Sequence, residues 1–262
     1  MEEQGEILNE NNLEPEEQQM EDVAEAEEKK VADGVIIKLD NVKKSFNGDF
    51  TALEDIDLEI QEGEFVSIVG ASGAGKSTFL KLIYAEEMPT EGEVYFEGKP
   101  LSAISRRKLP FHRRRIGTVF QDFKLLPKKT AFENVAYAME VSGAPTEEIM
   151  EDVPQILDIV GLSDKMDKYP RELSGGEQQK VVMARALIHK PIVIIADEPT
   201  GNLDPVASLE IVKLLLKINK LGTTVILASH DREVVNKAAK RVIVLDRGRV
   251  ICDDARGKYK MC

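Results

Sequence analysis

The segment FVSIVGASGAGKSTFLKLI, residues 65–83, decides how this sequence folds. It opens with the short apolar run 65–69, which predicts a buried β-strand. A glycine-rich loop follows at residues 70–78, and the apolar spacing of residues 79–83 predicts a helix directly after it. A loop of this kind between a strand and a helix indicates an α/β domain built around a largely parallel sheet.

Other short apolar or β-branched runs predict further strands of the same domain. The residues between 122 and 191 contain no run of comparable quality, and their apolar residues recur at helical spacing instead. We therefore expect a largely parallel sheet core with a helical insertion over about residues 122–190. The additional predicted strands cover residues 35–39, 93–96, 116–120, 192–196, 224–228 and 242–245, with a closing piece at 249–251 after the turn 246–248.

The composition excludes several classes of protein. A chain of 262 residues suits one large or two small domains. Its longest apolar runs, such as residues 192–196, are far shorter than the roughly 18 residues that span a bilayer. Residues 1–4 have neither the basic nor the apolar region of a signal peptide. Two cysteines, Cys252 and Cys262, are too few for a disulfide scaffold and lack partners for a zinc site, so a reducing cytoplasm fits best.

The negative charge of the chain is concentrated at its N-terminus. Residues 1–33 contain 13 acidic and two basic residues, a net charge of -11, whereas the whole chain carries -12. This tail has no aromatic residue and is rich in Glu, Gln and Asn, which predicts disorder. A solvating leader is the simplest role, and an interaction arm or an autoinhibitory mimic of an anionic ligand is the alternative. We expect the folded domain to comprise residues 34–262.

The glycine-rich loop matches the pattern G-x-x-x-x-G-K-[ST], in which backbone N–H groups surround phosphate oxygens. The start of the following helix adds a partial positive charge. Lys76 would supply a full charge to the β- and γ-phosphates, and Ser77 a hydroxyl ligand for Mg²⁺. An ordinary glycine-rich turn is the alternative, and the flanking strand and helix disfavour it. The predicted nucleotide-binding residues are Gly70, Ala71, Ser72, Gly73, Ala74, Gly75, Lys76, Ser77 and Thr78.

A second part of the site is predicted where the strand 192–196 ends in two carboxylates. Ligands of parallel sheets bind at the carboxyl ends of the strands, so these side chains should lie beside the phosphate loop. Asp197 is suited to hold Mg²⁺ through its water shell, and Glu198 to polarise the attacking water. The alternative is a strand that simply ends at two polar residues.

The stretch LSGGEQQK, residues 173–180, has both a structural and a functional interpretation. Ser174 and Glu177 match the capping box that opens a helix. However, the two glycines in the first turn cost helix stability, which suggests that something anionic approaches the backbone closely. Because the chain already has one phosphate loop, we expect two copies to meet head to tail, each covering the γ-phosphate of the other.

Over residues 35–254 the sequence resembles the ATP-binding subunits of ABC systems, whose motifs occur here in the family's order. The resemblance implies a P-loop ABC ATPase fold, in which a RecA-like mixed sheet core is joined by an antiparallel β subdomain and a helical insertion. It also implies ATP and Mg²⁺ as cofactors. The residue roles it implies are Phe46 stacking on adenine, Gln121 at the metal and nucleotide, Glu198 as catalytic base, His230 at the γ-phosphate, and Ser174, Gly175, Gly176, Glu177 and Asp204 contributed in trans. With the residues above, this gives Lys76, Glu198 and His230 as catalytic and Ser77, Gln121 and Asp197 as metal-binding.

A narrower resemblance rests on residues 120–130, 133–136 and 197–204. The first two segments are similar to bacterial cell-division ATPases of the FtsE family, and the third also to lipoprotein-release and macrolide-efflux ATPases. This implies a homodimer on ATP binding, at the cytoplasmic face of the membrane. It also implies an FtsX-type membrane partner, bound through residues 122–130, that activates cell-wall hydrolases. A transporter ATPase and an ATP-dependent scaffold that recruits division proteins remain the alternatives.

Four further features have a weaker connection to function. Phe123, Leu125 and Leu126 would form a partner groove if exposed, or pack inside the insertion. The basic cluster 106–115 has no interleaved aromatics for base stacking, so no sequence-specific nucleic acid is expected, and a solvated face is favoured over lipid contact. His112 and His189 are expected at the surface. Asp204 and Pro205 are a good N-cap and N1 pair for a helix to Lys220, with Gly222 past its end.

Overall fold

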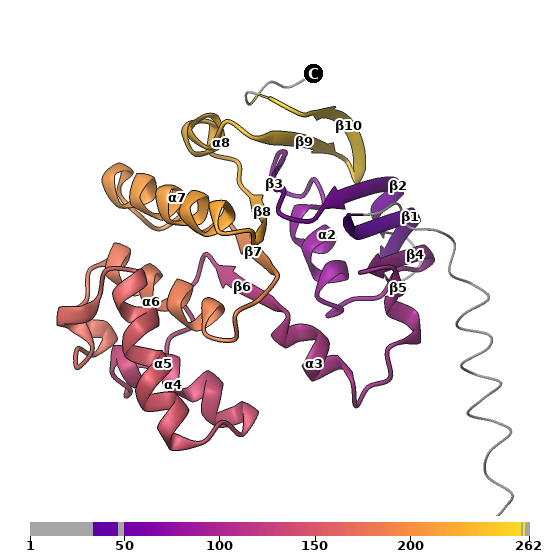
Figure 1. Cartoon of the computed structure of the whole chain (residues 1–262). Helices are drawn as coiled ribbons and strands as arrows, with labels where there is room; N and C mark the ends of the chain where they lie inside the picture. Colours follow the sequence, from indigo (N-terminus) through magenta and orange to yellow (C-terminus); the bar gives the residue numbers. More distant parts are fainter. Residues whose placement is uncertain (1–33, 47–49, 258, 260–262) are drawn as a thin grey trace, which may run out of the picture. The chain divides into compact units, whose positions relative to one another are not determined.

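The computed structural model describes residues 34–46, 50–257 and 259, so the predicted acidic tail, 1–33, lies outside the described residues. The described chain forms two sheets and their connecting helices (Figure 1). The strands are β1 (Val35–Phe46), β2 (Phe50–Gln61), β3 (Phe65–Val69), β4 (Glu91–Phe96), β5 (Lys99–Pro100), β6 (Ile116–Phe120), β7 (Val193–Asp197), β8 (Thr224–Ala228), β9 (Arg241–Asp246) and β10 (Arg249–Asp254). The helices are α2 (Lys76–Ile83), α3 (Leu109–Arg114), α4 (Ala131–Ser142), α5 (Thr146–Ile159), α6 (Gly175–Leu187), α7 (Pro205–Lys220) and α8 (Arg232–Ala238), with short 3₁₀ turns at Leu101–Ala103, Ser163–Lys165 and Pro170–Glu172.

The larger sheet has the strand order β10-β9-β3-β8-β7-β6, and all its pairs are parallel except β9 with β10. Every residue of β3 and β8 is buried, which explains why both were recognisable as continuous apolar runs. The register sets Asp197 beside Ala228 and Ile68 beside Ala228, so β3, β7 and β8 end at one edge of the sheet. This edge carries the candidate site.

The smaller sheet is antiparallel, in the order β2-β1-β4-β5. Its strand β2 was not predicted, because acidic residues alternate with the apolar ones and no continuous apolar run exists. Leu53, Ile56 and Ile60 on one face of β2 are fully buried. Such alternation is typical of a strand with one solvated face.

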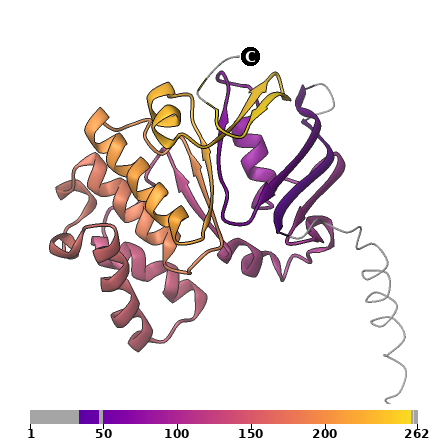
Figure 2. The same ribbon diagram turned by 45° about the horizontal axis from the view of Figure 1, so that its top comes forward.

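Helix α2 lies between the two sheets (Figure 2). Its buried residues Phe79 and Leu82 belong to one apolar cluster with Ile37 of β1, Ile56 of β2 and Ile68 of β3. Burial on both sides fixes the start of this helix, and with it the preceding phosphate loop, relative to the large sheet.

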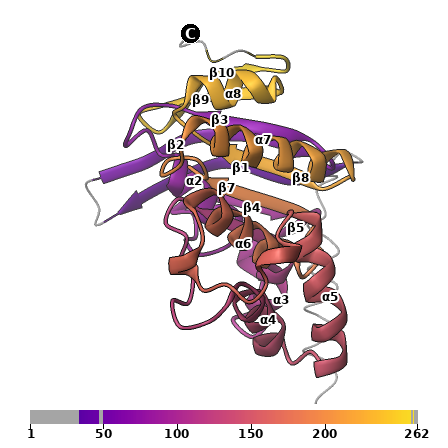
Figure 3. The same ribbon diagram turned by 90° about the vertical axis from the view of Figure 1, so that its left-hand side faces the viewer.

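Between β6 and β7 the structure has helices only, and α4 and α5 extend away from the sheets (Figure 3). Thr130 and Glu133 form a capping box at the start of α4, and Gly143 ends it in the left-handed region at φ 81°. A second apolar cluster joins these helices to α6 and α7. The predicted mixed sheet core with an antiparallel sheet and a helical insertion is therefore confirmed. Among the described residues, no helix has the length and apolar character needed to cross a membrane.

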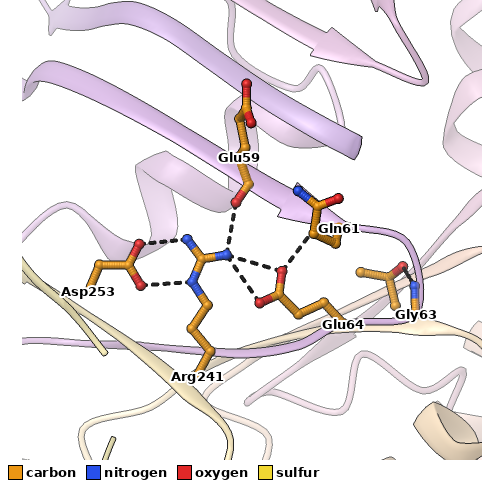
Figure 4. A network of polar contacts seen from close by, with 7 residues as sticks. Glu59, Gln61, Gly63, Glu64, Arg241 and Asp253 are labelled. Atoms are coloured by element: carbon orange, nitrogen blue, oxygen red, sulfur yellow. Dashed lines mark hydrogen bonds and ion pairs between the residues drawn. The ribbon is translucent and has the colours of Figure 1, made fainter. Parts of the chain in front are cut away.

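Arg241 at the start of β9 ties the two sheets together (Figure 4). Its guanidinium donates to both carboxylate oxygens of Asp253 at 2.7 and 2.6 Å, to Glu64 at 3.1 Å, and to the carbonyl of Glu59 at 2.9 Å. These bonds, above all those to Asp253, raise the pKa of Arg241. The bidentate geometry makes this a specific link between the end of β2 and the β9–β10 hairpin.

Candidate active site

A cavity of about 600 Å³ opens at the carboxyl edge of the large sheet. It brings together the phosphate loop, the residue after β6, the end of β7 and the residues after β8, all of which were predicted to meet there. Its lining residues are Phe50, Ala52, Gly70, Ala71, Ser72, Gly73, Gly75, Lys76, Ser77, Thr78, Gln121, Asp197, Glu198, His230 and Tyr259.

The phosphate loop adopts a backbone that requires glycine. Gly73 and Gly75 have φ values of 80° and 105°, in the left-handed region. A Cβ atom at Gly75 would lie 2.7 Å from the carbonyl oxygen of Ala52. No side chain caps the start of α2, so its first N–H groups lack a side-chain acceptor. The loop and helix start therefore present backbone donors to the cavity, as an anion site requires.

Lys76 is 8% exposed and its ammonium group is held inside the loop. Nζ donates to the carbonyls of Gly70 at 2.8 Å and Ala71 at 3.2 Å, and lies 3.8 Å from Oε1 of Glu198. The positive charge is thus fixed at the floor of the cavity, where a bound phosphate would meet it.

Asp197 is the last residue of β7, and one of its carboxylate oxygens is buried without a hydrogen-bond donor among the described residues. Its Oδ1 finds no hydrogen-bond partner among the described residues. Burial raises the pKa of Asp197, while a hydrogen bond with Ser77 and the charge of Lys76 oppose that shift. A buried acceptor without a partner costs free energy, and a cation would offset that cost. The pair of Ser77 and Asp197 therefore fits a hard cation with oxygen ligands. Among the described residues no group of three or more His, Cys, Asp and Glu could hold a metal.

Glu198 follows β7 in a strained backbone conformation, with φ at 48°. Its Oε1 lies 2.8 Å from Nδ1 of His230, and the backbone N–H of His230 donates to Oε2 at 3.3 Å. A non-glycine residue in the left-handed region persists only where the surroundings enforce it, often at functional sites. The strain and the histidine together aim the carboxylate into the cavity.

Gln121 connects the cavity to two loops. Its side-chain amide donates to Oδ1 of Asn202 at 3.4 Å, and Nδ2 of Asn202 donates to its carbonyl at 3.2 Å. A Cβ atom at Gly201 would lie 2.9 Å from the Gln121 amide, so the two loops touch. Gln121 also lines a neighbouring cavity of about 250 Å³ beside Gly201 and Leu203. Gln121 therefore links the nucleotide cavity to the loop that contains Gly201 and Asn202.

Residues 174–177 lie outside this chain's own cavity, since none of them lines it. The predicted capping box is confirmed: Ser174 Oγ accepts from Glu177 N, and the Glu177 carboxylate accepts from Ser174 N. The glycines have a structural reason that the sequence did not reveal. A Cβ atom at Gly176 would lie 3.0 Å from the Cβ of Ala207 in α7, so the close approach is between two helices of the same chain.

Phe46 is not among the residues that line the cavity. The Lys44 ammonium lies 4.8 Å from the centroid of its ring. Phe50, its partner across the β1–β2 pair, and Tyr259 near the C-terminus line the cavity instead. The sequence offered no motif for either residue. Ala74 is buried and Asp204 caps α7, as its sequence predicts, and neither lines the cavity.

The expectation of a surface position was wrong for His112. His112 is 6% exposed; its Nε2 lies 3.1 Å from the carbonyl of Ile83 and its ring packs edge-on to Phe96. His189 is half-buried, and burial lowers the pKa of both imidazoles. The local sequence around His112 could not reveal this burial, because the ring contact is made with Phe96 of β4, 16 residues earlier in the chain.

The loop 122–130 is firmly held. The Asn134 amide bonds the carbonyls of Leu126, Lys129 and Thr130, and its Oδ1 accepts from Leu126 N. Phe123 and Leu125, for which both exposure and packing were considered, are partly buried against the helical core. These contacts hold the loop 122–130 in a defined conformation.

The sequence and fold can now be compared with known proteins. The family described as ABC transporter matches residues 53–201, more than half of the chain. The chain belongs to the ABC transporter family. This ABC ATPase is 50% identical to the cell division ATP-binding protein FtsE of Bacillus subtilis (strain 168) over 224 residues, which are 86% of the chain and 98% of that protein. It is 48% identical to FtsE of Mycobacterium tuberculosis over 228 residues, covering 87% of the chain and 99% of the relative.

Solved structures carry the same fold. The dimeric structure of a post-hydrolysis state of the ATP-binding cassette MJ0796, bound to ADP and Pi, is 38% identical with a TM-score of 0.76, and covers 86% of this chain and all of that one. The predicted fold and ATPase class are thus confirmed, and the ABC ATPase is FtsE-like over almost the whole length of its relatives.

Proposed function

We propose that this ABC ATPase is the ATP-hydrolysing subunit of a bacterial cell-division complex. The observation that carries the proposal is the 50% identity over 98% of an FtsE protein. It would work at the cytoplasmic face of the membrane as a peripheral subunit. Its partner would be a membrane protein of the FtsX type, bound through the loop 122–130, that activates cell-wall hydrolases.

The active unit in this proposal is a dimer closed around two ATP molecules. One protomer would supply the phosphate loop, and the other would supply residues 174–177 together with Asp204. The absence of residues 174–177 from the lining of their own cavity supports this division of labour. A related cassette crystallised as a dimer with ADP and Pi supports it as well.

Within each site, Ser77, Asp197 and Gln121 would hold Mg²⁺, which neutralises charge on the phosphates. Lys76 and the backbone donors of residues 70–78 would fix the phosphates. Glu198 would accept a proton from the attacking water, and His230, bonded to that carboxylate, would orient it toward the γ-phosphate.

The substitution Glu198→Gln tests this proposal because it removes the base and keeps the shape. We expect turnover to fall by about 10²–10⁴ while ATP binding is retained. The variant should then elute as a dimer with ATP and as a monomer without it. Unchanged turnover would remove Glu198 from its role.

The same ATP-locked variant, isolated from detergent-solubilised membranes of its host, identifies the partner by mass spectrometry. Recovery of a membrane protein whose loss blocks septation supports the division role. Recovery of a lipoprotein-release or drug-efflux permease would favour the transporter alternative. A septal defect with the hydrolysis-dead variant would count against a scaffold that needs ATP binding alone.

A further inference from the structure

The segment that follows β10 reaches the nucleotide cavity near the end of the chain. Tyr259 is the last described residue, and it lines this cavity together with Phe50 and the phosphate loop. Its ring is partly buried. The residues proposed to bind and hydrolyse ATP leave Tyr259 without a role, although its position beside the phosphate loop brings it within the same cavity.

A tight turn and a buried glycine direct the chain from β10 toward α8. The backbone N–H of Arg256 donates to Oδ1 of Asp254 at 3.0 Å, and that of Gly257 donates to the carbonyl of Asp254 at 3.3 Å. Gly257 is buried, and a Cβ atom there would lie 2.8 Å from the Cβ of Val242 in β9. A residue without a side chain is therefore needed for the segment to lie this close to the sheet.

Two residues of α8, one helical turn apart, hold Tyr259 in place. Oδ1 of Asn236 accepts from the backbone N–H of Tyr259 at 2.8 Å. The Arg232 guanidinium lies 5.2 Å from the centroid of the tyrosine ring, within the range of a cation–π contact. The ring also packs against an apolar cluster that contains Val69 and Val235. Backbone and ring are both held, so the place of the ring at the cavity is set before a nucleotide binds.

The neighbours of Tyr259 belong to the segments around the phosphate end of the cavity. Val69 is the last residue of β3 and is directly followed by the phosphate loop. Arg232 is the first residue of α8, two residues after His230. Phe50, by contrast, comes from β2 of the smaller sheet. Tyr259 is thus attached to the phosphate loop and to the residues after β8, the two segments that would flank the γ-phosphate in the proposed mechanism.

The hydroxyl group of Tyr259 is available to a ligand. Within the part of the chain that the structure describes, the one hydrogen bond of this residue is made by its backbone N–H. A phenol hydroxyl is a hydrogen-bond donor, and donors bind most strongly to charged acceptors such as phosphate oxygens. Arg232 makes no salt bridge with a described carboxylate, so the charge beside the ring also favours an anion.

We propose that Tyr259 is a nucleotide-binding residue whose hydroxyl donates a hydrogen bond to the γ-phosphate of ATP. Gly257, Asn236 and Arg232 are positioning residues that hold it there. The inference rests on the place that the proposed function gives to the γ-phosphate in this cavity. ADP lacks the group that the hydroxyl binds, so this contact favours ATP over the product of hydrolysis.

The test is isothermal titration calorimetry of the full chain with Mg²⁺ and either ADP or the non-hydrolysable ATP analogue AMP-PNP. Tyr259→Phe keeps the ring and removes the hydroxyl. We expect the Kd for AMP-PNP to rise about tenfold, as for loss of one hydrogen bond to a charged group, and the Kd for ADP to change less than about twofold. The matched control is Tyr137→Phe on α4, an exposed tyrosine that does not line the nucleotide cavity, which should bind both nucleotides like the wild type.

Gly257→Ala tests the positioning of Tyr259 independently. The added Cβ cannot fit against Val242 unless the segment moves, so the hydroxyl should leave the cavity. We expect the Kd for AMP-PNP to rise about tenfold, as in Tyr259→Phe, and the Kd for ADP to stay within about twofold. In the double variant the loss should exceed that of Tyr259→Phe by less than about twofold, because both changes remove the same contact. Thermal melting checks that all variants are folded.

Three results would overturn the proposal. The first is a Tyr259→Phe variant that binds AMP-PNP like the wild type. The second is an equal loss of AMP-PNP and ADP binding, which would make Tyr259 a wall of the cavity and not a ligand of the γ-phosphate. The third is a double variant whose losses multiply to about 100-fold, which would mean that Gly257→Ala acts through other residues. Wild-type chain that binds neither nucleotide would overturn the proposed function as well, so the two failures are distinguishable.

Discussion

The two glycine-rich helix starts of this chain, before α2 and at α6, look alike in sequence and differ in structure. The glycines before α2 lie in the left-handed region and no side chain caps that helix. At α6, Ser174 and Glu177 satisfy each other's backbone N–H groups, and both glycines have helical backbone. The first N–H groups of α2 therefore remain available to a ligand, whereas some of those at the start of α6 are already hydrogen-bonded within the chain.

This structural difference indicates what each helix start contributes to a nucleotide site. The α2 start needs the rest of its own cavity, which the chain supplies through Asp197, Glu198 and His230. The described residues 174–177 at the α6 start do not line the nucleotide cavity of their own chain, and in the proposed dimer they would meet the phosphates of the partner. In that proposed dimer, a single chain would carry two halves of two different sites.

Mixing two inactive variants tests that conclusion most strongly. Lys76→Ala removes the charge that holds the phosphates, and Ser174→Arg places a bulky cation at the α6 start, so each alone should lose at least about 100-fold in ATPase activity. In a mixed dimer one site keeps both Lys76 and Ser174. Because half of randomly mixed dimers are of this kind, steady-state ATPase activity should recover to about a quarter of wild type.

The control for that experiment is Ser174→Ala mixed with Lys76→Ala. Ser174→Ala loses only the cap, worth about 1 kcal/mol of stability, and reports on folding without blocking closure. A mixture of Lys76→Ala and Ser174→Arg that is no more active than its components would contradict the shared site.

Alanine substitutions at one glycine of each start sharpen the comparison. At Gly75 the new Cβ would lie 2.7 Å from the carbonyl oxygen of Ala52 at a φ of 105°, so we expect a loss of about 2 kcal/mol in the free energy of unfolding. At Gly176 the backbone is helical and the Cβ would lie 3.0 Å from that of Ala207, so crowding and the gain in helix propensity should cancel to within about 1 kcal/mol. Urea unfolding measures both.

Nucleotide binding should separate the same two variants. Gly75→Ala distorts the phosphate loop and should weaken ATP binding at least about tenfold, whereas Gly176→Ala should leave binding to the isolated chain unchanged. Equal losses of binding would mean that the α6 glycines touch the nucleotide of their own chain.

The parts of the fold that the sequence predicted are those with a single dominant signal. Strands β3, β6 and β8 were predicted at their observed ends because each is a short run rich in β-branched and apolar residues between polar or glycine-containing segments. Strand β2 was missed because its buried face is interrupted by acids on the other face. A short apolar run therefore identifies a strand only when residues on both of its faces are apolar.

The residues of the candidate site were likewise predictable only where a strong local signal marks them. The phosphate loop, Asp197 and Glu198 were predictable because a motif and a strand end fix them to one sheet edge. Phe50 and Tyr259 enter the cavity through long-range packing, from the second strand of the other sheet and from the C-terminus. The inward turn of His112 depends on a contact with Phe96, and no local spacing encodes it.

The aromatic wall of the cavity gives the smallest expected effect and decides between sequence resemblance and geometry. The resemblance assigns adenine stacking to Phe46, whereas Phe50 lines the cavity and Lys44 lies over the Phe46 ring. Stacking on one aromatic ring contributes about 1–3 kcal/mol, and Phe50 is 62% exposed, so Phe50→Ala should raise KM for ATP about fivefold with kcat nearly unchanged. Phe46→Ala should raise KM less than twofold. Phe111→Ala, at a similarly exposed phenylalanine that lines neither the nucleotide cavity nor the neighbouring cavity, is the matched control for loss of a surface ring. A larger rise in KM for Phe46→Ala than for Phe50→Ala would show that adenine stacks on Phe46, as the family resemblance implies. The Lys44 side chain would then have to move off the Phe46 ring when ATP binds.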